Sequence, residues 1–347
     1  MTEVSPESAA MTLRAPLSQR LQNLREFASV EHRQIGLSLL RICLGALTLD
    51  FYVRHIAQRG FLWGANGVVP FSTFLEIMHR QRNFSLYMLS PAPAYELTVF
   101  ALGIVVAIAF TLGYKTRISA VLFYAFTWSI YSRNPFILDG GDNLLFLLAF
   151  YMMFADCGAY FSIDAARRSP DERPGPLPAL VHNFAVLAII TQLCLLYFTS
   201  GFYKIQGHMW QDGTAIYYIL RASEFNLSPK AHFFYDNDAV VTLLTWSTMV
   251  FQIAWPFLIW NRKARPVIAA GAFLLHTMIG YFMGLMWFSA VMISAELMIF
   301  DDEDYRRFGG WLSASFAALW ARWGRQPERP VLQDSSTPAD QAAESEA

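Results

Sequence analysis

The sequence predicts an all-α protein that crosses a membrane several times. Of the 347 residues, 55% are hydrophobic and only 15% are charged, whereas soluble globular proteins carry about 25% charged residues. The hydrophobic residues form long runs, and a helix of about 20 residues crosses a bilayer core about 30 Å thick. Because unpaired backbone groups find no water in that core, each run is expected to be a helix.

Seven apolar runs are clear, and the last can divide into two short helices at Gly280 and Gly284. We therefore expect a polytopic helical membrane protein with about seven or eight transmembrane helices. The third and fourth runs are short for a span. In chain order the runs are Ile35–Ile56, Tyr95–Leu112, Ala120–Tyr131, Leu144–Phe154, Ala179–Tyr203, Val240–Trp260 and Val267–Phe300.

Polar segments flank the apolar part, and we divide the chain at their limits. Residues 1–32 form a polar N-terminal tail and residues 33–301 the transmembrane domain. Residues 302–325 alternate large apolar side chains with arginines, a pattern typical of an amphipathic helix that lies in the membrane interface. Residues 326–347 are rich in Pro, Ser, Glu and Ala without a periodic apolar pattern, so this tail is expected to be disordered.

Charge and cysteine content exclude several other classes of protein. The net charge of −1 provides no basic field for nucleic acid, so the expected partner is the lipid bilayer. Cys43, Cys157 and Cys194 lie within or beside apolar runs and are interpreted as small buried hydrophobes. No spacing of cysteine or histidine is typical of a metal site, and none is expected.

Basic residues predict the orientation in the membrane. They gather in alternate loops around Lys115, Arg167 and Arg262 and in the N-terminal tail, and cytoplasmic loops carry such an excess of Lys and Arg. We therefore expect a multi-pass protein of the bacterial inner membrane with both termini in the cytoplasm. The outer loops, residues 59–93, 132–142 and 207–237, are expected to be irregular and to carry the functional surface.

Charged residues within apolar runs are costly in a bilayer, so each is a potential site. Asp50 and Arg54 lie four residues apart near the outer end of the first run, and we interpret them as a structural ion pair. Arg41 is expected to extend its charge toward the inner end. Asp139 and Asp142, just before the fourth run, can cap that helix or line an outer cavity.

The segment around Lys204 is the most informative part of the sequence. Tyr197, Gly201 and Lys204 share one face if the fifth helix continues, and Gly201 allows a backbone or a flat ligand to come close. A desolvated lysine loses its proton more readily and can act as a base. The structural alternative is a lysine that extends from the end of a span into the headgroup layer.

His276 lies on a second helical stripe in the last apolar run. The stripe also contains Gly280 and Met283. A histidine in such surroundings is most often a packed core residue. If the helix breaks at Gly284, His276 can line the same outer cavity as Tyr197, Gly201 and Trp210.

Several short motifs, taken together, resemble a known membrane domain. They are Arg41–Gly45 with Asp50, Asp139–Asp142, Ser200–Lys204 with Trp210 and Gly213, and His276. This set resembles the horizontally transferred transmembrane (HTTM) domain, which is related to the membrane domain of vitamin K-dependent gamma-glutamyl carboxylase. The resemblance covers approximately Arg33–Asp301.

The resemblance implies a chemical role for Lys204. The matching lysine deprotonates a reduced naphthoquinone at the outer membrane boundary; oxygen then converts it to a strong base that removes a glutamate γ proton before carbon dioxide adds. Where the carboxylases have a histidine ahead of the fourth span, this chain has Gly141, Asp142 and Asn143. Three functions remain open: a quinone-linked or peptide-maturation enzyme whose substrate comes from a peptide or protein partner, a non-catalytic binding or assembly subunit, and a transporter.

Overall fold

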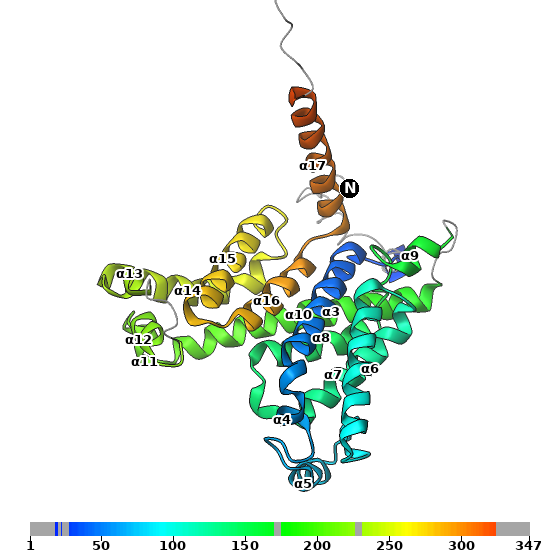
Figure 1. Ribbon diagram of the computed structural model, residues 1–347. Coiled ribbons are helices and arrows are strands. Elements are labelled where there is room, and N and C mark those ends of the chain that lie inside the picture. Colours follow the sequence, from blue (N-terminus) through cyan, green and yellow to red (C-terminus); the bar gives the residue numbers. More distant parts are fainter. Residues whose placement is uncertain (1–17, 20–21, 23–27, 170–174, 226–230, 324–347) are drawn as a thin grey trace, which may run out of the picture. The chain divides into compact units, whose positions relative to one another are not determined.

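The structure, a computed structural model, describes residues 18–19, 22, 28–169, 175–225 and 231–323, and their regular elements are helices joined by turns and irregular segments (Figure 1). These ranges contain no β-strand, as the sequence predicts. Most of the N-terminal tail and all of residues 326–347 lie outside them. The chain divides into two units, residues 1–305 and residues 306–347, and the helices before α17 belong to the first.

Eight helices of ten or more residues correspond to the predicted apolar runs. They are α3 (Gln34–His55), α6 (Pro93–Leu112), α7 (Thr116–Arg133), α8 (Gly140–Met152), α10 (Pro176–Ile205), α14 (Asp238–Leu258), α15 (Arg265–Met283) and α16 (Met286–Glu296). The last predicted run does divide in two. Gly284 has a left-handed backbone with φ of 73°, which ends α15, whereas Gly280 lies inside that helix.

Among the described residues, five helices are by length and composition long and apolar enough to cross a membrane by themselves, whereas about seven or eight crossings are predicted from the sequence. They are α3 with its extension to Trp63, α6, α10, α14 and α15. Helix α8 has 13 residues and α16 has 11, so they extend about 20 Å and 16 Å, less than the bilayer core. Polar residues such as Thr116, Ser119 and Arg133 lower the apolar character of α7.

The connecting segments contain short helices where irregular loops were expected. Each is stabilised by local backbone hydrogen bonds, such as the one from the Gly64 amide to the Gly60 carbonyl. The short elements are η1 (Ile56–Gln58), α4 (Arg59–Trp63), α5 (Phe71–Gln81), η2 (Leu86–Met88), η3 (Pro135–Ile137), α9 (Ile163–Arg167), α11 (His208–Gln211), α12 (Ala215–Arg221), α13 (His232–Tyr235) and η5 (Leu297–Ile299). Helix α17 (Asp302–Trp323) follows, and its residues from Arg306 onward belong to the second unit.

Helix α3 packs mainly against α6 and α16, and α10 packs against α14 (Figure 1). Two apolar clusters form the core. One surrounds the buried side chains of Leu40, Leu148 and Ile189, and the other surrounds Trp63 and Phe100 beyond the far end of α3. Cys157 is buried and the other two cysteines are half-buried, all as free thiols.

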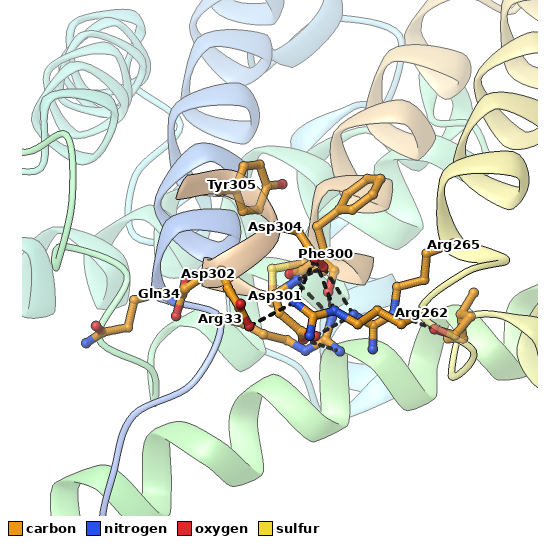
Figure 2. A network of polar contacts seen from close by, with 12 residues as sticks. Arg33, Gln34, Arg262, Arg265, Phe300, Asp301, Asp302, Asp304 and Tyr305 are labelled. Atoms are coloured by element: carbon orange, nitrogen blue, oxygen red, sulfur yellow. Dashed lines mark hydrogen bonds and ion pairs between the residues drawn. The ribbon is translucent and has the colours of Figure 1, made fainter. Parts of the chain in front are cut away.

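Polar contacts join several helix ends in one group, which we call the Arg33 end. There the start of α3 meets the start of α15 and the residues after η5: Arg33 pairs with Asp301 at 3.0 Å, and Arg265 also pairs with Asp301. Figure 2 shows this network. Asp302 accepts hydrogen bonds from the Gln34 and Ile35 amides at 3.2 and 2.7 Å, which satisfies two free donors at the start of α3.

Arg41 links further helices to the Arg33 end. Its guanidinium is fully buried and donates to the carbonyls of Phe110 and Cys157 at 2.9 Å and of Phe161 at 2.7 Å. The end of α6 and the segment after α8 therefore lie beside the first turns of α3. Instead of extending to the headgroups, as expected, Arg41 serves as a buried donor to chain carbonyls.

Candidate functional site

Lys204 lies in the last turn of α10. Its Nζ is 2.7 Å from Ser200 Oγ and 3.4 Å from the Ser200 carbonyl oxygen, and it stands 5.2 Å from the centre of the Trp210 ring. No carboxylate forms an ion pair with Lys204 among the described residues. The amine is therefore held by one hydroxyl and one aromatic face, without a counter-charge.

The space beside Gly201 is occupied by a neighbouring helix. A Cβ atom at this position would lie 2.7 Å from Ile253 Cγ1 and 3.2 Å from Gln252 Cβ, both on α14. Of the two interpretations of Gly201, a close backbone or a flat ligand, the structure shows the close helix. The glycine lets α10 and α14 pack tightly.

Tyr197 and His276, which the sequence placed on separate stripes, meet in the core. The Tyr197 Oη lies 2.8 Å from His276 Nε2 and donates to Glu296 Oε1 at 2.6 Å. The Tyr197 ring stacks on Trp255 at 4.3 Å between ring centres. This polar triad joins α10, α15 and α16, and its side chains are at most 6% exposed.

Glu296 was missed by the sequence analysis although a signal was present. It is the one Asp, Glu, Lys or Arg between Val267 and Phe300, and a charged residue inside an apolar run marks a potential site. His276, which lies in the same run, was considered. The partners of Glu296 could not be deduced from the sequence, because the contact to its carboxylate comes from Tyr197 on α10.

Asp139 and Asp142 form a capping box at the start of α8. Asp139 Oδ1 accepts from the Gly141 and Asp142 amides at 2.6 and 3.2 Å, and Asp142 Oδ2 accepts from the Asp139 amide at 2.8 Å. The other oxygen of Asp142 accepts from Trp287 Nε1 at 2.9 Å. The two carboxylates therefore satisfy free backbone donors and connect α8 with α16.

Both aspartates also border a cavity of about 300 Å³. Its other walls are mostly apolar and include Phe74 and Trp128, with the buried Arg133 as a cation. Arg133 donates to the Val69 carbonyl at 2.8 Å and to the Gly64 carbonyl. The cavity lies between α7, α8 and the loop that contains α5.

The predicted site residues therefore fall into three places. Tyr197 and His276 belong to the buried triad, Asp139 and Asp142 to the cavity near α5, and Lys204 with Trp210 to the end of α10. No hydrogen bond or ion pair links Lys204 to the other two places among the described residues. Seven residues separate Tyr197 from Lys204, which is about 10 Å along the helix.

Asp50 and Arg54 form an ion pair with an O–N distance of 2.7 Å. Both side chains are exposed, at 39% and 67%. An exposed pair of this kind contributes about 1 kcal/mol or less to stability.

Comparison with known proteins gives the family context. The HTTM domain model matches residues 70–305. The uncharacterized protein YitO of Bacillus subtilis (strain 168) is 25% identical over 236 residues, or 64% of this chain and 73% of YitO. The sporulation-delaying protein SdpB of the same organism is 21% identical over 242 residues, or 67% of this chain and 71% of SdpB. No solved structure matches the chain.

Proposed function

We propose, from the premise that this chain belongs to the HTTM domain family, that it is an enzyme of the bacterial inner membrane. Its substrate is a small lipid-soluble molecule such as a reduced quinone, and Lys204 is the base. The neutral hydroxyl of the substrate gives its proton to the neutral Lys204 amine, which leaves the more reactive substrate anion and an ammonium group. Gly201, which packs against α14, and Trp210, whose ring lies beside the amine, position this end of α10.

The observation that carries the proposal is the environment of the Lys204 amine. It has no carboxylate partner among the described residues and rests between Ser200 Oγ and the Trp210 ring. An ammonium group without a counter-charge near the end of an apolar helix loses much of its stabilisation. That is the condition under which lysine acts as a base.

Aromatic side chains around the same turn suit a lipid-soluble substrate. Phe202 and Tyr203 are 52% and 74% exposed, and Phe198 stacks on Phe202 with 6.1 Å between ring centres. These side chains give the end of α10 an apolar surface. A flat hydroquinone with an isoprenoid tail can approach Lys204 along it from the bilayer.

The test uses the full chain in lipid vesicles with a reduced naphthoquinone. Deprotonation makes the hydroquinone react faster with oxygen, so we expect oxygen consumption above that of protein-free vesicles. Lys204→Arg keeps the charge and reach but does not release a proton, so it should lose the excess rate while remaining folded. Lys263→Arg, an exposed lysine in the loop before α15, is the matched control and should keep the rate.

Two outcomes would contradict the proposal. Wild-type vesicles that consume oxygen no faster than protein-free vesicles would remove the enzymatic function for this substrate class. Full activity of Lys204→Arg, together with instability of Lys204→Ala, would make Lys204 an anchor of the helix end.

A non-catalytic membrane binding or assembly subunit is the second proposed function. It is favoured by the packing role of Gly201 and by the capping box of Asp139 and Asp142, because each of these residues already has a structural task. In that case a peptide or protein partner, which would also supply the substrate of a maturation enzyme, should copurify with the chain independently of Lys204.

A further inference from the structure

The polar triad is a continuous hydrogen-bonded chain of three ionisable side chains. Tyr197 Oη stands in the middle, 2.8 Å from His276 Nε2 and 2.6 Å from Glu296 Oε1. Each end of the chain has a polar atom without a hydrogen bond of ordinary geometry among the described residues: His276 Nδ1 and Glu296 Oε2. Both atoms are buried.

The surroundings of the triad are aromatic, and the described residues place no compensating cation there. Trp255 stacks on Tyr197, and Phe288 lies 5.7 Å from His276 between ring centres. No lysine or arginine forms an ion pair with Glu296 in the part of the chain that the structure describes. An ionised carboxylate in this position would be an uncompensated buried charge, which is very costly.

Ionisable groups on the helices packed around the triad are engaged elsewhere. Arg41 of α3 donates to carbonyls at the Arg33 end, Asp142 of α8 bonds Trp287, and Arg265 of α15 pairs with Asp301. On α10, His182 bonds the Asp156 amide and the His32 carbonyl. His55 of α3 bonds the Phe51 carbonyl, and Tyr151 of α8 bonds Gln192. The remaining groups are the thiols of Cys43 and Cys194, the hydroxyls of Tyr52, Tyr203 and Tyr281, the exposed pair Asp50 and Arg54, Lys204 beside Ser200 and Trp210, and Asp238 in the first turn of α14.

We infer that Tyr197, His276 and Glu296 form a proton-exchange site inside the membrane domain. The site binds one proton, which equilibrates between the imidazole and the carboxyl through the Tyr197 hydroxyl. This inference does not depend on the proposed role of Lys204, because the two places share no hydrogen bond or ion pair among the described residues.

The transfer can be written with every proton accounted for. Before the proton arrives, His276 is neutral with its proton on Nε2 and Glu296 is a carboxylate. A proton that binds His276 Nδ1 makes an imidazolium. The Nε2–H bond then breaks as a new O–H bond forms on Tyr197, while the original Tyr197 proton moves to Glu296 Oε1. The products are a neutral imidazole with its proton on Nδ1, an intact tyrosine hydroxyl and a carboxylic acid, and no other reactant is needed.

Infrared spectroscopy of the full chain in lipid vesicles tests the site. We expect a carboxylic-acid C=O band that persists at a pH where exposed glutamates are ionised, shifts in D₂O and is absent in Glu296→Gln. Tyr197→Phe keeps the ring stacked on Trp255 but removes the bridging hydroxyl. Because it removes one hydrogen bond, we expect it to move the titration midpoint of the band by roughly half to one pH unit.

Tyr151→Phe is the matched control. Its hydroxyl lies 3.4 Å from Gln192 Oε1, outside the triad, so the band should not change. If Tyr197→Phe also leaves the band unchanged, or if Glu296→Gln removes no such band, the proton-exchange site is wrong.

A second measurement shows whether the Tyr197→Phe variant is folded and tests the same hydrogen bond. Solid-state NMR of the ¹⁵N-histidine-labelled chain reports the seven histidines. Tyr197→Phe should shift the Nε2 signal of one histidine, His276, and leave the rest unchanged. An identical spectrum would overturn the inference.

Discussion

At the scale of single residues, the neighbours of a side chain decide between interpretations that the sequence leaves open. Gly201 has the same identity whether it admits a ligand or a helix, and only the position of Ile253 on α14 distinguishes them. The Tyr197–Glu296 contact is equally hidden, because the residues are 99 positions apart. Spacing rules reveal which residues share a helix face but not which face of another helix they meet.

Enlarging Gly201 should destabilise the fold. A Cβ atom there would stand 2.7 Å from Ile253 Cγ1 and 3.1 Å from the Ile253 amide nitrogen, so Gly201→Val must push α10 and α14 apart at a cost of about 1–3 kcal/mol. Thermal unfolding in detergent measures the loss. The control is Gly60→Ala, where a Cβ atom meets nothing within 4 Å; equal midpoints for both variants would contradict the packing role of Gly201.

At the scale of elements, the long apolar runs made the helices predictable. The first helix is predicted over Ile35–Ile56 and observed over Gln34–His55, a difference of one residue at each end. The agreement is this close because the limits of the apolar run coincide with the limits of the helix. Short elements such as α5 were not predicted, since their positions depend on contacts with distant side chains such as Arg133. The capping pattern around Asp139 was one of the alternatives considered, and its local geometry follows from the chain itself.

The start of α8 offers a test that separates capping from catalysis at Asp139. Asparagine also accepts hydrogen bonds at an N-cap, so Asp139→Asn should keep most of the stability, whereas Asp139→Ala should lose about 1 kcal/mol. Thermal unfolding and oxygen consumption with reduced naphthoquinone are measured together. A stable Asp139→Asn variant without activity would show that the carboxylate has a chemical role beyond the cap.

The hydrogen bonds between Asp164 and the start of α7 should make the stability of the fold depend on pH in the acid range. Burial by itself would raise the pKa of Asp164, but hydrogen bonds from the amide and hydroxyl of Thr116 and the amide of Lys115 outweigh it and lower this pKa below its ordinary value of 3.8. A lowered folded-state pKa stabilises the fold above 3.8, and this contribution disappears as the pH falls toward the folded-state value. Asp164→Asn should therefore lower the unfolding temperature at neutral pH and flatten its decline at acid pH.

Asp212→Asn is the matched control for Asp164. Asp212 is exposed and its side chain forms no hydrogen bond among the described residues, so this variant should keep both the neutral stability and the acid decline of the wild type. A decline that is as steep in Asp164→Asn as in the wild type would assign the acid sensitivity to other carboxylates.

At the scale of the whole membrane domain, the contacts at the helix ends constrain the number of crossings. The start of α3 and the residue before α17 meet in the ion pair of Arg33 and Asp301, so the chain between them must cross the membrane an even number of times. Five long helices are an odd number. We therefore predict that the shorter helices α7, α8 and α16 also cross, which gives an even set of eight, and that protein neighbours rather than lipid satisfy their polar groups.

The last prediction concerns the sidedness of these eight helices. Lys115, Arg168 and Arg262 lie in loops between helices, and the positive-inside rule assigns such loops to the cytoplasm. A reporter enzyme that is active only outside the cytoplasm should therefore be silent when fused after Lys115, Arg168, Lys263 or Asp301, and active after Ala65, Phe136 or Asp212. A fluorescent protein that matures only in the cytoplasm, fused at the same positions, should give the opposite pattern. If the first reporter is active after both Asp301 and Lys263, the predicted orientation is reversed, and the ion pair of Arg33 and Asp301 can still form. If it is active after Asp301 alone, the number of crossings is odd, which the contact between Arg33 and Asp301 does not allow.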